Sequence, residues 1–401
     1  MEKLCMVRRL LRKWASISAL VLIGGLIFLN GGVLSEPQFS AMFVFGDSLI
    51  DNGNNNFINS QAKANFWPYG IDFFQGPTGR FTNGKTCIDF LAELIGLPYL
   101  PPYAIPFAVG RDIINGVNFA SAAGGILEQS GQALGDRFSF SRQVENFGII
   151  KRQLQNQLND TDLQHYLEKA LAVLILGSND YINNYLIPSY GSRAKYKPEQ
   201  FADLLITHYT KHLMVRDQPA GHQLHLAVFS PWVRSWGSNF LSCALHDQGL
   251  RRFFVAGVPA LGCSPAQRTV ARTPAGKCVN FSNDVAQMFN TRLKTLVDRL
   301  NATHADATFI YGDTFNAFME ILGHPSKYGL SVVNEACCGS GRNRAEKTCF
   351  PLSIPCMNRE QYAFWDGYHP TQAVHRVLAL MAYNGPDSLS YPINLHQMAH
   401  I

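Results

Sequence analysis

The sequence predicts an α/β fold with three layers, in which a parallel sheet carries helices on both faces. Short apolar runs of strand length recur along the chain, and stretches with helical periodicity separate them. This alternation is typical of parallel sheets built from strand-helix-strand units. No Pro/Ser-rich linker or internal repeat divides the 401 residues, so we predict a single domain over residues 36–401.

Five runs are predicted to form strands because each is apolar throughout, as expected for strands that are buried on both faces. In chain order they are residues 42–45, 117–120, 172–176, 253–258 and 308–311. Between the last two, apolar residues from Val285 to Leu300 recur at offsets of 3, 4, 8, 11, 12 and 15, which lines one face of a helix. Residues 141–158 and 370–383 are predicted to form two further helices.

Residues 215–243 depart from this organisation, because they hold neither a helical nor a strand period for long. Without them, HYTKHLM would run directly into ALHDQGLRRFFVAG, giving one helix, a glycine stop and a buried strand. Two interpretations stay open, a surface insertion and translated non-coding sequence from a faulty gene model. We favour the second, since loops of this length without structure are uncommon in compact domains.

The N-terminal stretch resembles a secretory signal peptide. Arg8, Arg9, Arg12 and Lys13 precede an apolar run over about residues 15–29, and small glycines follow. A run of about 15 residues is shorter than the ~20 that a bilayer core requires. We therefore predict that residues 1–32 are removed, that no integral membrane segment remains, and that the protein is secreted to the extracellular space.

The mature chain is predicted to be almost neutral. Residues 1–32 contain five Lys/Arg and Glu2, so their removal changes the formal charge from +5 to +5 − 5 + 1 = +1. No basic stripe of the kind that neutralises phosphates remains, so we expect no nucleic-acid partner. Sequons at Asn159, Asn280 and Asn301 are compatible with secretion and glycosylation.

Cysteine usage also indicates an oxidising compartment. Cys87 is expected to be a buried thiol on a helix face. Six of the nine cysteines form an even cluster, which favours disulfides, although six cysteines allow 15 pairings and the sequence does not choose among them. The six are Cys263, Cys278, Cys337, Cys338, Cys349 and Cys356. A zinc site is disfavoured because no C-x-x-C pair occurs.

A candidate nucleophile follows the first predicted strand, in FVFGDSLIDN. Ligands of open parallel sheets bind beyond the carboxyl ends of the strands, so Ser48 is well placed to meet a substrate. Gly46 permits an unusual turn there, and a helical turn starting near Ser48 would aim N–H groups at an anion. The alternative is that Asp47 or Ser48 only caps that turn.

A serine nucleophile requires a histidine base that a carboxylate orients. WDGYHP supplies Asp366 and His369, which are three residues apart in a turn-prone stretch. This spacing allows the carboxylate to accept from one imidazole nitrogen while the other faces the serine. Taken alone, however, a D-x-x-H pattern has little specificity.

Acyl transfer also requires fixed donors for the oxyanion. Asn179, in LGSND, follows a buried strand at the same sheet edge, with an Asx-turn as the alternative interpretation. Gly124 and Gly125, in VNFASAAGGIL, leave a backbone N–H accessible, with a tight turn as the alternative.

Taken together, these blocks resemble the GDSL esterase/lipase family of plants, a branch of the SGNH hydrolases. The resemblance covers residues from about 43 to 383 and includes FGDSLIDNGNNN, GVNFASAAGGIL, LGSNDYINNYL, FFVAGVPALGCSP, ACCGSG and FWDGYHPT. It implies a flavodoxin-like SGNH hydrolase fold, secretion, and no metal or organic cofactor. Residues 215–243 interrupt a helix where the family reads straight through.

Carried over by motif, the resemblance implies Ser48 as nucleophile, Asp366 as the orienting acid and His369 as base. It implies oxyanion donors at the Ser48 N–H, at Gly125 (with Gly124 possible) and at Asn179. The expected function is hydrolysis of a carboxylic ester, from a small molecule, lipid or polysaccharide, through an acyl-enzyme. Transfer of the acyl group to another hydroxyl, and a non-catalytic secreted binding protein on the same fold, are the alternatives. A typical α/β-hydrolase is disfavoured because no G-x-S-x-G elbow occurs.

Aromatic residues near Ser48 are open to two interpretations. Phe57, Phe66, Trp67 and Tyr69 could line a groove for the acyl group, or they could belong to the core. Apolar aromatics are more often part of a core.

Overall fold

The computed structural model describes residues 37–105, 113–214, 244–274 and 276–401, and Gln38–Ile401 form one compact unit. The predicted signal peptide, residues 1–32, and the atypical segment 215–243 lie outside the described residues. The described residues on either side of that segment nevertheless meet. The N–H of Leu245 donates to the carbonyl of His212 (3.0 Å), and that of His246 donates to the carbonyl of Leu213 (3.1 Å).

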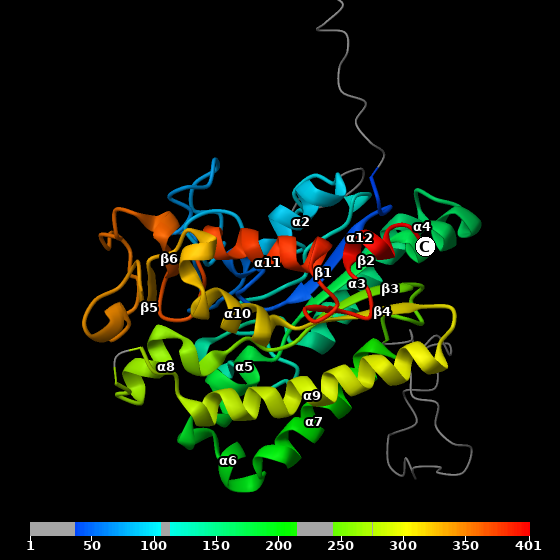
Figure 1. The fold of residues 1–401 in the computed structure, drawn as a ribbon. Coiled ribbons are helices and arrows are strands. Elements are labelled where there is room, and N and C mark those ends of the chain that lie inside the picture. Colours follow the sequence, from blue (N-terminus) through cyan, green and yellow to red (C-terminus); the bar gives the residue numbers. More distant parts are fainter. Residues whose placement is uncertain (1–36, 106–112, 215–243, 275) are drawn as a thin grey trace, which may run out of the picture. The chain divides into compact units, whose positions relative to one another are not determined.

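A five-stranded, mostly parallel sheet forms the centre of the fold (Figure 1). Its order is β1-β2-β3-β4-β7, and only β7 runs antiparallel to its neighbour. The strands are β1 (Met42–Gly46), β2 (Leu171–Ile175), β3 (Arg252–Ala256), β4 (Thr308–Gly312) and β7 (Ser390–Tyr391). Four of the five predicted strands are therefore present.

The fifth predicted strand, residues 117–120, is not a regular strand. It lies along the outer edge of β1, where Val44 donates to Val117 and Phe119 donates to Val44, but only a single bridge forms. The ladder stops because the Gly46 N–H, which would donate to Phe119, donates instead to the Gln143 side chain (2.8 Å). Counted as the second strand, this segment gives the flavodoxin-like order 2-1-3-4-5.

Helices cover both faces of the sheet, which confirms the three-layer α/β prediction (Figure 1). Alternate residues of β1 point to opposite faces, so Phe43 and Phe45 join one core and Met42 and Val44 join the other. The first face is covered by α3 (Phe140–Gln155), α4 (Asp160–Lys169), α7 (Pro198–Leu213) and α9 (Asn280–Thr303). The second is covered by α2 (Cys87–Ile95), α10 (Thr314–Gly323), α11 (Gln372–Asn384) and α12 (Leu395–Met398).

The three predicted helices correspond to α3, α9 and α11, with ends that differ by a few residues. Short helical segments connect the larger elements. They are η1 (Asn54–Phe57), η3 (Gln132–Leu134), α5 (Ser178–Asp180), η4 (Tyr181–Tyr185), η5 (Pro188–Tyr190), α6 (Ser192–Lys195), η7 (Leu261–Cys263), α8 (Pro265–Val270), η8 (Pro325–Tyr328), η9 (Arg342–Arg344) and η10 (Arg359–Gln361).

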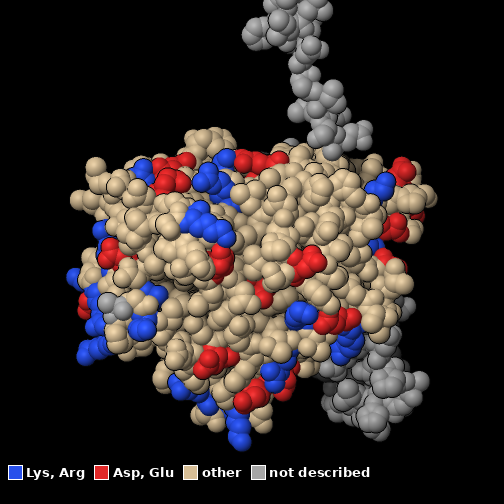
Figure 2. Space-filling view, in the orientation of Figure 1, with Lys and Arg blue, Asp and Glu red and all other residues tan. Residues whose placement is uncertain are grey.

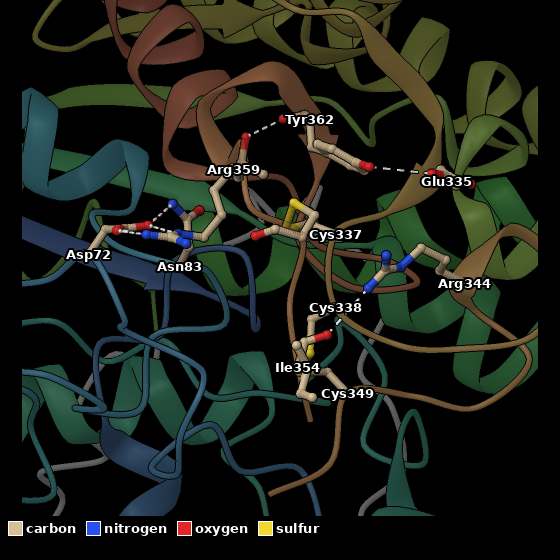
Figure 3. Close-up of a disulfide and its surroundings, with 12 residues drawn as sticks. Asp72, Asn83, Glu335, Cys337, Cys338, Arg344, Cys349, Ile354, Arg359 and Tyr362 are labelled. Atoms are coloured by element: carbon tan, nitrogen blue, oxygen red, sulfur yellow. Dashed lines mark hydrogen bonds and ion pairs between the residues drawn. A yellow bond between two sulfur atoms is a disulfide. The ribbon is translucent and has the colours of Figure 1, made fainter. Parts of the chain in front are cut away.

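A small disulfide-linked lobe, residues 332–364, projects beside the main sheet (Figure 1). Its two strands, β5 (Val332–Ala336) and β6 (Tyr362–Phe364), are parallel. The six clustered cysteines form three disulfides, and two of these lie in the lobe, as Cys337–Cys356 and Cys338–Cys349 (Figure 3). The third is Cys263–Cys278. Cys87 is a free, buried thiol on α2, as expected.

Two of the three sequon asparagines have a structural role. The Asn301 side chain donates to the Phe309 carbonyl (2.8 Å) and accepts the Phe309 N–H (2.9 Å), so its amide nitrogen is held against β4. Asn159 is exposed and caps α4, because its side chain accepts the N–H of Asp162 (2.9 Å). Asn280 is exposed.

Candidate active site

Ser48 lies in a tight turn that follows β1. Asp47 holds this turn, because its carbonyl accepts the N–H of Asp51 (2.9 Å) and its carboxylate accepts that of Leu49 (3.0 Å). The helical turn expected near Ser48 is therefore present, but it does not continue into a helix. Asp47 caps it, whereas the Ser48 hydroxyl is directed elsewhere.

Asp366 lies in a second loop, which follows β6, and its carboxylate binds backbone N–H groups of this same loop. Its Oδ1 accepts the backbone N–H groups of Tyr368 and His369, both at 2.9 Å. The Trp365 N–H donates to the His369 carbonyl (2.7 Å). The loop is thus fixed by its own acidic side chain, and the imidazole is presented from a rigid turn.

Hydrogen bonds join Ser48, His369 and Asp366 in one chain. His369 Nδ1 lies 2.8 Å from both carboxylate oxygens of Asp366, and His369 Nε2 lies 2.7 Å from Ser48 Oγ. An ionised carboxylate only accepts, so Nδ1 carries the proton and Nε2 keeps a lone pair for the serine hydroxyl. Residues separated by 321 positions therefore meet in the geometry that activates a serine.

The family assignment agrees with this geometry. Residues 42–381 match the family described as GDSL-like Lipase/Acylhydrolase.

The chain belongs to the GDSL-like lipase/acylhydrolase family.

Relatives from Arabidopsis thaliana support this assignment over most of the chain. One GDSL esterase/lipase is 46% identical over 372 residues, which cover 92% of this chain and 89% of the relative. A second is 44% identical over 367 residues, 91% of this chain and 90% of the relative. A third is 42% identical over 395 residues, 98% of this chain and 99% of the relative. The resemblance stated from the motifs is thus confirmed, and the family is one of carboxylic ester hydrolases.

Tyr69 supports the acid of this GDSL hydrolase. Its hydroxyl donates to Asp366 Oδ2 (2.7 Å), and the residue is buried. Burial alone would raise the pKa of Asp366, but the electrostatic interaction with the His369 ring and the hydrogen bonds to the carboxylate outweigh it and hold the pKa below its usual value. Tyr69 was considered for an acyl groove, yet neither it nor Phe57, Phe66 or Trp67 lines the hollow beside Ser48.

The carboxyl group of Asp47 differs from that of Asp366, because it has few hydrogen-bond donors and its pKa is raised. Its carboxylate is buried, one oxygen accepts only the Leu49 N–H, and the other has no partner among the described residues. Burial raises the pKa of Asp47 to about 7, although the Leu49 N–H and the electrostatic interaction with His369 both act to lower it. A carboxyl group that changes charge near neutral pH thus lies next to the nucleophile.

Asn179 is positioned as a candidate oxyanion donor. It lines the same hollow as Ser48 and His369, and its Oδ1 accepts from Asn183 (2.6 Å). One amide hydrogen donates to the Gly124 carbonyl (2.9 Å), and the second has no acceptor in the described part of the chain. A fixed amide with one free N–H suits this role.

The backbone N–H groups of Gly124 and Gly125 differ in their hydrogen bonds. The Gly124 N–H donates to Ser121 in a tight turn (3.0 Å), so it is engaged, whereas the Gly125 N–H has no acceptor among the described residues. Neither glycine lines the hollow beside Ser48. The donor assigned to Gly125 stays a prediction.

Asp180, which the motif analysis did not single out, joins two of the motifs. Its carboxylate accepts the N–H groups of Ile126 (2.8 Å) and Leu127 (2.9 Å) and the hydroxyl of Ser130 (2.6 Å). A Cβ at Gly125 would lie 2.8 Å from this carboxylate, so only glycine fits there. Its position directly after Asn179 in LGSND was the available signal.

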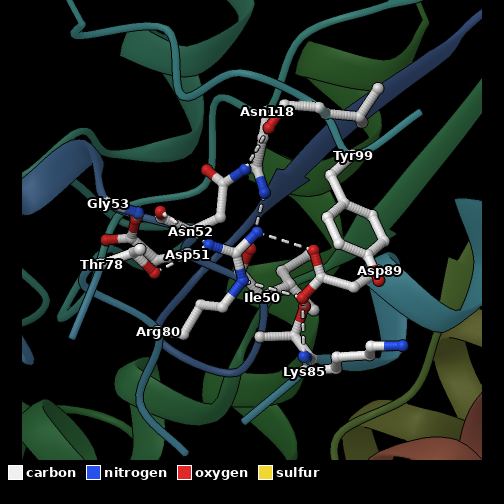
Figure 4. A network of polar contacts seen from close by, with 12 residues as sticks. Ile50, Asp51, Asn52, Gly53, Thr78, Arg80, Lys85, Asp89, Tyr99 and Asn118 are labelled. Carbon is white, nitrogen blue, oxygen red and sulfur yellow. Dashed lines mark hydrogen bonds and ion pairs between the residues drawn. The ribbon is translucent and has the colours of Figure 1, made fainter. Parts of the chain in front are cut away.

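The polar run after Ser48 forms a second scaffold (Figure 4). Asp51 accepts the N–H groups of Gly53 and Asn54 (both 2.7 Å) and of Ala122 (3.0 Å). Asn54 donates to the carbonyl of Asn118 (2.9 Å). These side chains connect the loop that contains Gly124 and Gly125 to the loop that contains Ser48. This connection explains why asparagines of this motif are buried. Figure 4 also shows the neighbouring buried ion pair of Arg80 and Asp89 (2.7 Å).

Two hollows adjoin at the site. The first, of about 470 Å³ including its open mouth, contains Ser48, Asn179 and His369. The second, of about 600 Å³ including open solvent at its mouth, is mainly apolar and lies between the sheet, α10 and α11. Leu49 and Phe318 line both hollows.

Among the described residues, no group of three or more His, Cys, Asp or Glu is arranged to hold a metal ion. None of the helices in that part of the chain is long and apolar enough to cross a membrane.

Proposed function

We propose that this GDSL hydrolase cleaves carboxylic esters through an acyl-enzyme on Ser48. The observation that carries the proposal is the 2.7 Å contact of Ser48 Oγ with His369 Nε2, while Nδ1 of the same ring contacts Asp366. His369 takes the hydroxyl proton as Oγ attacks the ester carbonyl, and it then returns that proton to the departing alcohol. Water repeats the two steps on the acyl-enzyme and releases the acid.

The oxyanion of each tetrahedral intermediate is proposed to accept from the Asn179 amide and from the backbone N–H groups of Ser48 and Gly125. Loss of one such donor costs on the order of a hundredfold or more in kcat. Asn179→Ala should therefore lower kcat by about that factor while the protein stays folded, although its melting temperature should fall because the Gly124 carbonyl and the Asn183 amide each lose a partner. Near-normal turnover would reject the role of Asn179.

Serine-directed labelling tests the nucleophile. A fluorophosphonate should label the folded protein and should not label Ser48→Ala, with circular dichroism confirming that both are folded. Absence of labelling in folded wild-type protein would reject the proposal and favour the non-catalytic binding protein. If the protein is labelled but transfers the acyl group to an added alcohol in preference to water, the acyltransferase alternative is correct.

We propose that the acyl chain extends into the apolar hollow, because Leu49 and Phe318 line both hollows. Narrowing the junction by Phe318→Trp should lower hydrolysis of longer p-nitrophenyl esters more than that of the acetate. Phe315→Trp is the matched control, since Phe315 is also a nearly buried α10 residue but lines neither hollow. Equal effects on all esters in both variants would reject this placement.

We also propose that the protein is secreted and loses residues 1–32. Three disulfides, with Cys87 as the one free cysteine among the described residues, support an oxidising compartment. Peptide mass spectrometry of protein from the culture medium should find an N-terminus near residue 33. Recovery of the intact N-terminus would reject cleavage, and recovery of peptides from 215–243 would reject the gene-model interpretation.

A further inference from the structure

The lobe carries an unusually exposed group of apolar side chains, which we call the apolar tip: Phe350, Leu352, Ile354 and Met357. Their exposed fractions are 56%, 82%, 87% and 91%, and the last three are the most exposed large hydrophobic side chains among the described residues. Single exposed apolar residues are normal on protein surfaces, but a concentration of them indicates a surface that is covered in use.

The apolar tip is held rigidly. The disulfides Cys337–Cys356 and Cys338–Cys349 close the segment at both ends. Within it, the Leu352 N–H donates to the Trp67 carbonyl (3.0 Å), and the Ser353 N–H donates to the Phe350 carbonyl (3.0 Å). Arg344 reaches the Ile354 carbonyl (3.4 Å), as Figure 3 shows. The exposed side chains are therefore presented by a fixed loop.

Leu352 is in an unfavourable conformation for its side chain. Its φ is +66°, in the left-handed region where glycine and asparagine are favoured and a branched side chain costs free energy. The side chain gains little in return, because it is 82% exposed. Neither the backbone nor the core accounts for a leucine here, and such an outlier points to a function.

Basic residues flank the apolar tip. Between residues 337 and 357 the cations are Arg342, Arg344 and Lys347 and the one acid is Glu346, so the local charge is +3 − 1 = +2. Figure 2 shows Lys and Arg side chains gathered at the left margin, over α8 and the segment that Figure 1 colours orange. Apolar side chains beside basic ones match the boundary between the acyl chains and the anionic headgroups of a lipid surface.

The lobe is also joined to the candidate site. The Cys338 N–H donates to the carbonyl of Trp365 (2.7 Å), the residue before Asp366. Trp67, which holds the tip, is two residues from Tyr69, whose hydroxyl binds Asp366. We propose that the apolar tip inserts into the surface of an anionic lipid assembly and attaches the enzyme there. This attachment does not depend on the proposed chemistry.

Vesicle sedimentation tests the proposal, with the full chain carrying Ser48→Ala so that no lipid is consumed. The probes are large unilamellar vesicles of phosphatidylcholine, with and without phosphatidylserine. Leu352→Asn/Ile354→Ser should weaken partitioning roughly a hundredfold, because two buried apolar side chains are lost. The matched control Leu380→Ser/Ile401→Ser removes two exposed apolar side chains elsewhere and should stay within about twofold.

The outcomes are distinct. Leu352→Asn alone should keep or raise the melting temperature, since asparagine accepts the left-handed conformation, so weak binding would not reflect misfolding. Arg342→Gln/Lys347→Gln should weaken binding only to vesicles with phosphatidylserine. The proposal is overturned if wild-type protein does not bind vesicles, if it self-associates through the tip instead, or if the tip and control variants bind alike. If the tip and control variants bind alike, vesicle binding belongs to another part of the chain, such as the apolar residues 15–29.

Discussion

The candidate site and the disulfide-linked lobe fix their loops in different ways. Around the site, buried carboxylates act as cross-links: Asp51 accepts three N–H groups, and Asp180 accepts two N–H groups and a hydroxyl. In the lobe, two disulfides take this role. A hydrogen-bonded carboxylate is a strong cross-link only where water is excluded. The loops over the sheet provide such an interior, whereas the small core of the lobe is built around the buried disulfides themselves.

The largest expected effect comes from removing one of these carboxylates. Asp51→Ala leaves the buried N–H groups of Gly53, Asn54 and Ala122 without an acceptor, and each costs about 1–3 kcal/mol. We predict a loss of about 3–9 kcal/mol in the free energy of unfolding, measured by urea denaturation. Asp313→Ala, which removes a helix cap, should cost only about 1 kcal/mol. Equal losses would show that Asp51 is not a cross-link.

The second effect comes from the lobe. Removing Cys337–Cys356 with serine at both positions opens a loop of 19 residues and should cost about 3 kcal/mol. Because this disulfide holds the apolar tip, vesicle binding should fall as well. Cys263→Ser/Cys278→Ser opens a loop of 15 residues outside the lobe, so it should cost a similar free energy and leave vesicle binding unchanged. Loss of binding in both double variants would mean that the lobe does not act separately.

The sequence predicted features that depend on short-range order. The apolar runs gave four of the five sheet strands, and the contiguous D-x-x-H stretch placed Asp366 beside His369. Other features depend on contacts between distant residues. The Gln143 side chain that ends the ladder at residues 117–120 lies 97 residues from Gly46, and Tyr69 lies 297 residues from Asp366. The cysteine pairing was open for the same reason, because spacing alone does not state which loops meet.

The third effect separates Asp47, whose pKa is raised by burial, from Asp366, whose pKa lies below its usual value. An unfolded aspartate has a pKa of about 3.9, whereas burial raises the pKa of Asp47 to about 7. Between these values the folded chain keeps a proton that the unfolded chain releases, so this group makes the folded state lose stability as the pH rises. An asparagine side chain at this position cannot ionise. Asp47→Asn should therefore become more stable relative to wild type by roughly 2 kcal/mol between pH 5 and pH 8.

The measurement is urea unfolding of both proteins at the two pH values. Asp162→Asn, at an exposed position on α4, is the control and should differ from wild type by the same amount at each pH. If the curves for Asp47→Asn and wild type run parallel with pH, then the Asp47 carboxyl is solvated or paired in solution. The contrast between Asp47 and Asp366 would then be wrong.

The smallest expected effect is the change in kcat when the Asp366 carboxylate loses one of its several hydrogen bonds. Tyr69→Phe removes only the 2.7 Å bond to Asp366, which keeps its bonds to the His369 ring and to two backbone N–H groups. The expected loss is about 1 kcal/mol, or roughly fivefold in kcat, with KM unchanged because Tyr69 does not line the hollow. Tyr383→Phe is the matched control and should leave kcat unaltered, because among the described residues the Tyr383 hydroxyl binds Gln38 alone. A hundredfold loss of kcat in Tyr69→Phe would instead mean that the remaining hydrogen bonds to Asp366 do not compensate for the lost one. The site would then depend on a single hydrogen bond, as the lobe depends on each disulfide.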